Sequence, residues 1–176
     1  MIRKSGEAEQ SALEQAANLM CAAARTAPKT CGIDNIEVLI LTEKDVLKLI
    51  PMMLEIANRD SRPSCERDAK NIESVKVCVI IGAKNNPPGL NCGFCGFKTC
   101  EGLKKAGGVC AFNSMDLGIA LSSAAETASQ FHIDNRLMLS IGKAALELGL
   151  FDKDVKQAIG IPLSATGKNI FFDRKI

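Results

Sequence analysis

Apolar residues recur along the chain with two different periods. Residues 7–25 carry apolar side chains three and four positions apart, which predicts an amphipathic helix that ends before Pro28. Residues 37–42 and 75–82 are short runs rich in Val, Ile and Leu, and residues 156–163 form a third such run. These runs predict buried strands. Because strands alternate with helices, we expect one layered α/β or α+β domain.

The segment between the first two expected strands also has a helical pattern. Residues 45–57 predict a helix, but Pro51 should bend it or begin a second helical segment, because proline supplies no N–H group. Residues 58–74 are polar and are expected to be mostly loop with a short helix.

Two further helices are expected near the C-terminus. Asn113 or Ser114 is a suitable cap for the first of them. The second is expected to begin with Asp134 as its cap and to stop at Gly149. Residues 164–174 have the composition of an ordered loop.

Composition and charge narrow the class of protein. The 176 residues are 47% hydrophobic and 24% charged, which suits a folded domain rather than a disordered chain. The net charge of +2 and the lack of a basic run argue against nucleic acid as a partner. The first ten residues lack a signal-peptide pattern, and no apolar run is long enough to span a bilayer. We therefore expect a cytoplasmic protein that does not bind membranes.

Half of the eight cysteines are gathered in one short segment. Cys92, Cys95, Cys100 and Cys110 follow the spacing Cys-x2-Cys-x4-Cys-x9-Cys. Four closely spaced thiolates on a loop are what an iron–sulfur cluster requires, so these cysteines are predicted to bind one [4Fe–4S] cluster. Nearby glycines favour the tight turns that aim main-chain N–H groups at a cluster.

Two alternatives remain open for these four cysteines. Zinc also binds four thiolates, but structural zinc loops usually contain two Cys-x2-Cys pairs, and this segment contains one. The second alternative is a set of metal-free or redox-active thiols. Positive charge on Lys98, Lys104 and Lys105 favours the cluster, whose thiolates and iron together are anionic.

The remaining cysteines and the single histidine are expected to have structural roles. Cys21 on the first helix and Cys78 in the second strand are expected to be apolar fillers. Cys31 and Cys65 stand in turn-like contexts, where a reactive thiol is the less favoured alternative. His132 is expected to have a structural or capping role at a helix–helix turn.

The cysteine segment resembles a small four-cysteine iron–sulfur module. That module occurs in corrinoid iron–sulfur proteins and in a subunit of membrane electron-transport complexes. The shared positions are Asn91–Gly96 and Cys100, whereas the spacing to Cys110 is shorter here than in the module. The resemblance supports the cluster and leaves Cys110 as the least secure ligand.

The whole chain resembles the uncharacterised ferredoxin-domain proteins of archaea and anaerobic bacteria. Beside the cysteine segment, the resemblance rests on His132–Arg136 with Ser140–Lys143, and on Gly160–Ser164 with the residues up to Arg174. It implies a redox protein with a ferredoxin-like segment.

A second resemblance, to the nitroreductase family, concerns the fold. It rests on Ala24–Pro28, the strand at 38–41, Asp116 at the head of an Ala-rich helix, and Gly160–Pro162. It implies an α+β layered sheet with helices and a homodimer. Nitroreductases bind FMN at the subunit interface, but their N-terminal Arg-Arg-Ser-type motif has no counterpart before Glu7, so FMN is an alternative here. The positions that the resemblance assigns to the flavin are Lys29, Thr30, Lys168 and Arg174.

Taken together, the sequence predicts a single nitroreductase-like domain over residues 1–176 with an iron–sulfur segment inserted at 88–112. The predicted function is electron transfer through one [4Fe–4S] cluster to a redox partner of unknown identity. The alternatives are an FMN-dependent oxidoreductase and a zinc-binding, non-redox module. Since no nucleophile–base arrangement occurs, no catalytic residue is assigned.

Overall fold

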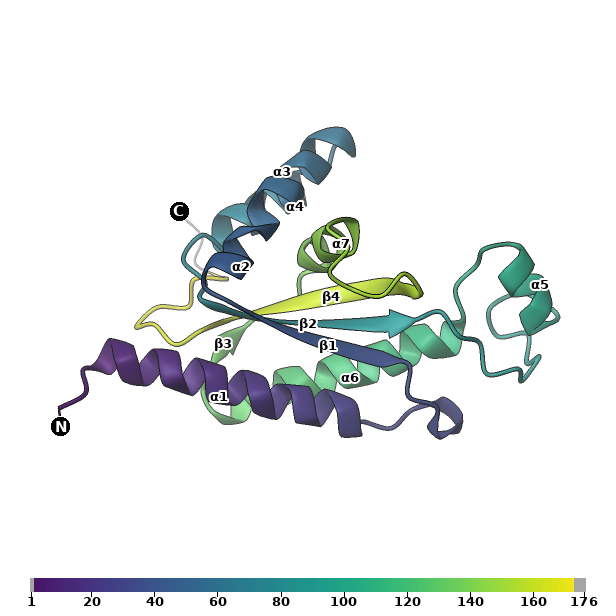
Figure 1. Cartoon of the computed structure of the whole chain (residues 1–176), viewed down its shortest axis with the longest axis horizontal. Coiled ribbons are helices and arrows are strands. Elements are labelled where there is room, and N and C mark those ends of the chain that lie inside the picture. The colour runs from purple at the N-terminus through teal and green to yellow at the C-terminus, as the bar shows by residue number, and fades with distance from the viewer. Residues whose placement is uncertain (1, 173–176) are drawn as a thin grey trace.

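The protein is a four-stranded antiparallel sheet with helices on both faces (Figure 1). A computed structural model describes residues 2–172. The strand order is β1-β2-β4-β3, and every neighbouring pair is antiparallel. The strands are β1 (Ile36–Thr42), β2 (Val77–Lys84), β3 (Asp134–Asn135) and β4 (Val155–Ser164). The fold is thus α+β, as the sequence predicted.

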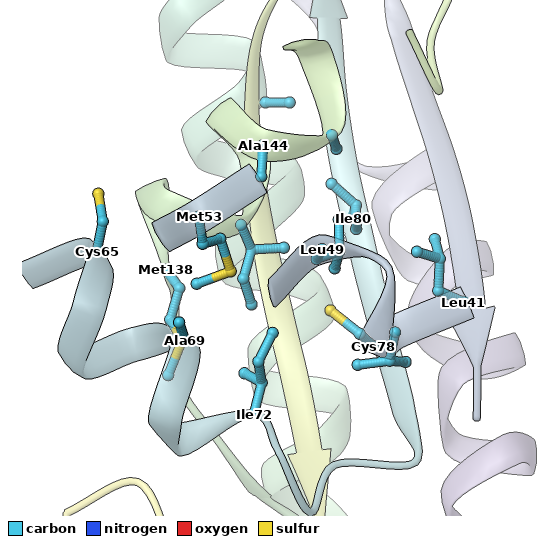
Figure 2. Close-up of a cluster of buried hydrophobic side chains, with 14 of the residues drawn as sticks. Leu41, Leu49, Met53, Cys65, Ala69, Ile72, Cys78, Ile80, Met138 and Ala144 are labelled. Atoms are coloured by element: carbon cyan, nitrogen blue, oxygen red, sulfur yellow. The ribbon is translucent and has the colours of Figure 1, made fainter. Parts of the chain in front are cut away.

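The two faces of the sheet are covered by different sets of helices. One set consists of α1 (Ser5–Thr26) and α6 (Ala111–Gln130). The other consists of α2 (Lys44–Leu47), α3 (Leu49–Arg59), α4 (Pro63–Asn71) and α7 (Leu139–Glu147). Because side chains alternate along a strand, Val79 of β2 packs towards α1 and α6, whereas Cys78 and Ile80 pack towards α3 and α7. Figure 2 shows side chains from the buried cluster between the sheet and helices α3, α4 and α7.

A glycine sets the closest approach of α7 to the sheet. A Cβ atom at Gly142 would lie 1.8 Å from the main-chain oxygen of Ala158 in β4. Gly160 in the same strand makes room for Ile141 in the same way. The contact between α7 and β4 therefore requires glycine on both sides.

Most of the expected elements are confirmed. The first helix and the three long strands agree with the predicted ranges to within two residues. Pro51 lies in the first turn of α3, which begins at Leu49 as a helical segment separate from α2. The polar stretch 58–74 contains one short helix, α4.

Two predicted helix starts are wrong. Asp134 does not cap a helix but belongs to β3, which pairs with the end of β4, and α7 begins only at Leu139. Helix α6 begins at Ala111 rather than after Asn113 or Ser114. Asn113 is buried inside the helix, and Cys110 occupies the N-cap position. Local capping preference was overridden in both cases by pairing and packing with distant segments.

Two short helices lie where none was expected. These are the 3-10 helix η1 (Thr30–Gly32) and α5 (Cys100–Lys105). Within the described residues, every helix is too short or too polar to cross a lipid bilayer.

Candidate metal centre

The cysteine segment forms a lobe beyond one end of the sheet. The chain enters the lobe from the end of β2, makes α5 within it, and returns through α6 (Figure 1). Its entry is the turn-forming stretch 85–89, as the sequence indicated. The lobe is thus placed by the two elements that bracket it, a central strand and a 20-residue helix.

All four predicted metal ligands line a single pocket in this lobe. The sulfur-bearing residues Cys92, Cys95, Cys100 and Cys110 share the pocket with a largely apolar wall. The wall includes Pro88, Leu90, Phe94, Phe97, Leu103 and Phe112. The structure therefore places in the lining of one pocket four cysteines that are spread over 19 residues of sequence.

Burial of the four thiols decreases across the pocket. Cys110 is buried, Cys95 and Cys100 are half-buried, and Cys92 is exposed. The rings of Phe94 and Phe112 meet with their centroids 5.7 Å apart. The pocket is therefore protected at Cys110 and open at Cys92.

Tight turns shape the first half of the pocket. Asn91, Gly93 and Gly96 all have positive φ angles, of 49°, 74° and 86°. The N–H group of Gly96 donates to the Gly93 carbonyl at 2.9 Å. The Asn91 side-chain oxygen accepts from the N–H group of Cys100 at 2.8 Å, across nine residues. These turns fold the chain so that Cys92, Cys95 and Cys100 border one space.

Two of the cysteines stand at helix beginnings. Cys100 is the first residue of α5, where the Thr99 hydroxyl accepts from the Gly102 N–H group at 3.0 Å. Cys110 is the N-cap of α6. A helix N-terminus stabilises negative charge, so both places suit a thiolate.

The nearby lysines belong to the surface of the lobe. Lys98, Lys104 and Lys105 are all exposed, and Lys105 pairs with Glu101 at 2.7 Å. They contribute long-range positive charge rather than direct contacts to the pocket.

An asparagine outside the predicted site holds the segment of Cys110, the fourth predicted ligand. The Asn85 side chain donates to the Gly108 carbonyl at 2.8 Å and accepts from the Cys110 N–H group at 3.3 Å. Its own N–H group donates to the Asp154 carbonyl at 2.9 Å. Asn85 therefore links the segment that contains Cys110 to the chain that enters β4. The sequence marked this residue only as part of a turn.

The sulfur atoms of the four cysteines do not form a tight group. Of the four cysteines, all in the described part of the chain, no three have sulfur atoms that lie within 4.8 Å of one another. A tetrahedral zinc ion with Zn–S bonds of about 2.3 Å places sulfur atoms about 3.8 Å apart. In a [4Fe–4S] cubane each thiolate binds a different iron atom, so the sulfur atoms stand farther apart.

The residues implied for a flavin have other contacts. The Lys29 side chain is almost fully buried, and its ammonium donates to the Arg25 and Ala27 carbonyls at 2.5 and 2.8 Å. Lysine in this position caps the C-terminus of α1 and complements its dipole. The N–H group and hydroxyl of Thr30 both donate to one carboxylate oxygen of Asp116, at 3.0 and 2.9 Å. Asp116 is buried in α6, so this pair ties η1 to that helix.

Lys168 lies far from Lys29 and Thr30 within one chain. It follows the end of β4, whereas η1 precedes the beginning of β1, and the strand register puts these two points at opposite ends of the sheet (Figure 1). Arg174 lies outside the described residues.

The other thiols divide between core and surface. Cys78 is fully buried in β2, and burial raises the pKa of its thiol to about 12, as suits an apolar filler. Cys65 is also buried, in α4, and Cys21 is half-buried on α1. Cys31 is exposed in η1, and His132 is exposed at the turn after α6 with a φ angle of 56°.

A group of carboxylates near the lobe already has its counter-charge. Oxygen atoms of Glu37, Asp152 and Asp154 lie within 4.8 Å of one another. The Lys84 ammonium contacts all three, at 2.7, 3.3 and 3.8 Å, and the hydrogen bond to Glu37 is the main cause that raises its pKa. This group is an ion-pair network around a lysine.

Comparison with known proteins places the chain in a family. Residues 106–174 match the family described as uncharacterized proteins containing a ferredoxin domain (DUF2148). A protein of Archaeoglobus fulgidus described as an uncharacterized protein is 38% identical over 183 residues, covering 99% of this chain and 98% of that one. The chain belongs to this ferredoxin-domain family.

Solved structures of other proteins resemble the fold of this chain. A nitroreductase with bound FMN from Desulfitobacterium hafniense covers 96% of this chain with a TM-score of 0.61 and 13% identity, over 81% of its own length. The nitroreductase CinD from Lactococcus lactis, in complex with nicotinic acid, covers 98% with a TM-score of 0.61 and 11% identity, over 86% of its length. At such low identity the similarity establishes a nitroreductase-like fold and nothing further.

Proposed function

We propose that the protein binds one [4Fe–4S] cluster through Cys92, Cys95, Cys100 and Cys110 and serves in electron transfer. The observation that carries this proposal is the shared pocket, which all four cysteines line. Membership of a ferredoxin-domain family supports it. In this proposal residues 88–112 are the cluster-binding insert of a single nitroreductase-like domain.

The pattern of the cysteine segment favours a cluster over zinc. The segment contains one Cys-x2-Cys pair, whereas structural zinc loops usually contain two. The wall of the pocket is apolar and aromatic, and a low-polarity surrounding is one of the factors that set a cluster's reduction potential. Cys100 and Cys110 also stand at helix beginnings, where the helix dipole stabilises negative charge.

The residues of the lobe would have distinct roles in electron transfer. A bound cluster would supply one-electron chemistry. The buried side at Cys110 excludes water, and the exposed side at Cys92 brings a cluster close to the surface. Phe94 is 65% exposed beside this opening, so it offers an apolar contact for a redox partner.

Anaerobic purification followed by spectroscopy and metal analysis tests the proposal. Because the chain has neither Tyr nor Trp, bound chromophores dominate its absorbance. We expect a broad band near about 400 nm that dithionite bleaches, with about four iron and four sulfide per chain. A colourless protein with one zinc per chain would instead establish the non-redox alternative.

A flavin-dependent oxidoreductase is the second candidate function. The similarity of the fold to a nitroreductase with bound FMN supports it. The contacts of Lys29 and Thr30 weaken it, because both side chains are engaged in linking α1, η1 and α6. Resolved flavin bands in the same spectrum, or FMN released on denaturation, would favour this function.

We also propose that the protein is a homodimer, as the nitroreductase resemblance implies. Met115 and Ile119 are exposed on successive turns of α6, which is consistent with a partner on that helix. Light scattering on the anaerobic protein measures the mass, and a monomer at micromolar concentration would refute the dimer.

A further inference from the structure

A second pocket lies between the beginnings of α4 and α7. It has a volume of about 540 Å³ including its open mouth. Figure 2 shows Cys65 of α4 and Met138, the residue before α7, on the elements that border it. It shares no lining residue with the cysteine pocket.

Positive charge dominates the lining of this pocket. Four cationic side chains line it: Arg62, Arg67, Arg136 and Lys143. Asp68 is the single carboxylate among the described lining residues. Counting also Asp60, which pairs with Lys143, two positive charges remain unbalanced in a chain whose total net charge is +2. A local excess of positive charge of this kind attracts anions.

Buried contacts hold one of these cations in place. Arg67 donates to one oxygen of Asp68 from two nitrogens, at 3.0 and 2.8 Å. The second oxygen of Asp68 accepts from the Ser140 hydroxyl at 2.6 Å, and Asp68 and Ser140 are both buried. The guanidinium at the pocket is thus fixed by a link between α4 and α7.

Two more of the cationic side chains, Arg136 and Lys143, are held by contacts with other segments. Arg136 donates to the Phe171 carbonyl at 3.1 Å and stands 5.3 Å from the centre of the Phe172 ring. Lys143 is hydrogen-bonded to Asp60. A ligand that meets cations already held in one conformation loses less side-chain entropy on binding.

The fourth cation, Arg62, is available for a ligand. In the described part of the chain its side chain makes no hydrogen bond or ion pair, and it is exposed at the N-cap of α4. The main-chain N–H groups of Leu139 and Ser140, in the first turn of α7, also lack acceptors within the helix. Charged donors and helix N–H groups meet at one pocket, which is the combination that binds phosphate.

We propose that this pocket binds a small molecule through a phosphate group. Arginine guanidinium groups recognise phosphate oxygens in pairs, and the first turn of α7 adds main-chain donors. The site is independent of the cysteine pocket, so its failure would leave the proposed electron-transfer function untouched.

Phosphate binding to the intact protein tests the proposal. Inorganic phosphate is titrated at constant ionic strength, with chloride as the balancing anion, and binding is measured by calorimetry and by the rise in Tm. We expect saturable binding that Arg62→Ala weakens about tenfold and that Arg62→Glu abolishes. Arg62→Lys should retain part of the affinity, because it keeps the charge but not the planar fork.

A matched control separates specific binding from general charge. Lys153 is exposed before β4 and does not line the pocket, so Lys153→Ala removes the same charge and should leave phosphate binding unchanged. Because the Arg62 side chain has no partner in the described chain, its variants should fold with an unchanged Tm in chloride. Equal effects of phosphate and chloride, or equal affinity in the native protein and Arg62→Glu, would overturn the proposal.

Discussion

The sheet and the cysteine lobe are stabilised in different ways. The sheet carries two large buried clusters, and residues such as Val79 and Ile80 are fully buried on alternate faces. In the lobe Leu103 is buried, while Phe94 and Leu90 are largely exposed. The lobe depends instead on turns and a few side-chain hydrogen bonds, as from Asn91 and Asn85. Packing therefore sets the shape of the sheet, whereas the lobe needs local geometry and, in our proposal, a cluster to complete it.

The largest effect is expected on cluster binding, with the fold of the sheet unchanged. Replacing Cys95→Ala removes one of the four proposed ligands, so iron and sulfide should fall from about four per chain to nearly none. The sheet should stay folded, because Cys95 belongs to neither buried cluster. Far-UV circular dichroism and iron analysis on the same sample measure both. Cys21→Ala, on α1, is the control and should keep the full iron content; full iron in Cys95→Ala would refute the ligand assignment.

The second expected effect is confined to the sheet. In Gly142→Ala the new methyl group would meet the Ala158 carbonyl, which is main chain and cannot move aside. We expect the free energy of unfolding to fall by about 3 kcal/mol or more, measured by urea titration. Gly6→Ala is the control, because nothing lies within 4 Å of a Cβ atom there, on the exposed first turn of α1. It should leave the free energy of unfolding within about 1 kcal/mol of the native value. A Gly142→Ala protein as stable as the native one would contradict the close packing of α7 on β4.

A smaller effect tests the link between the two regions. Asn85→Ala leaves the Gly108 carbonyl and the Cys110 N–H group without their partner, at a cost of about 1–2 kcal/mol. We expect faster loss of iron to a chelator and a shifted reduction potential, with a nearly unchanged Tm of the sheet. Asn85→Asp keeps the acceptor for Cys110 but not the donor for Gly108. Its rate of iron loss should therefore lie between those of the native protein and Asn85→Ala. Loss of iron at the native rate in Asn85→Ala would show that this residue does not position the ligand.

The smallest expected effect concerns acid. The hydrogen bond from Arg59, followed by the one from Lys143, lowers the pKa of the Asp60 carboxyl well below its usual range. A lowered carboxyl pKa stabilises the folded state above the pKa of the unfolded chain, and this contribution is lost as the pH falls through the folded value. Asp60→Asn should therefore have a lower Tm than the native protein near pH 7, and the difference should shrink below about pH 4.

A surface pair supplies the control for the acid experiment. Asp45 pairs with Lys48 on the exposed side of α2, and Asp45→Asn should change the Tm little at any pH. A Tm difference between Asp60→Asn and the native protein that grows towards low pH would contradict the stated sign.

The sequence grouped four cysteines that the structure places in the lining of one pocket. These cysteines lie within 19 residues, so spacing and turn chemistry act over a short stretch of chain. Asn85 was missed as a contact of Cys110 because its partners are 23 and 25 residues away. The residues implied for a flavin were chosen by resemblance to a family. That resemblance did not predict that Lys29 caps the C-terminus of α1.

The sequence by itself determined the long helices, the three long strands and the grouping of four cysteines. Hydrophobic period and cysteine spacing are local properties, and they can be read without knowing which segments meet. The tertiary structure alone decided that Asp134 pairs in a strand, that Asn85 holds the Cys110 segment, and that cations of α4 and α7 share a pocket. Each of these depends on contacts between residues far apart in the chain, and such contacts exist only once the sheet and its two layers have formed.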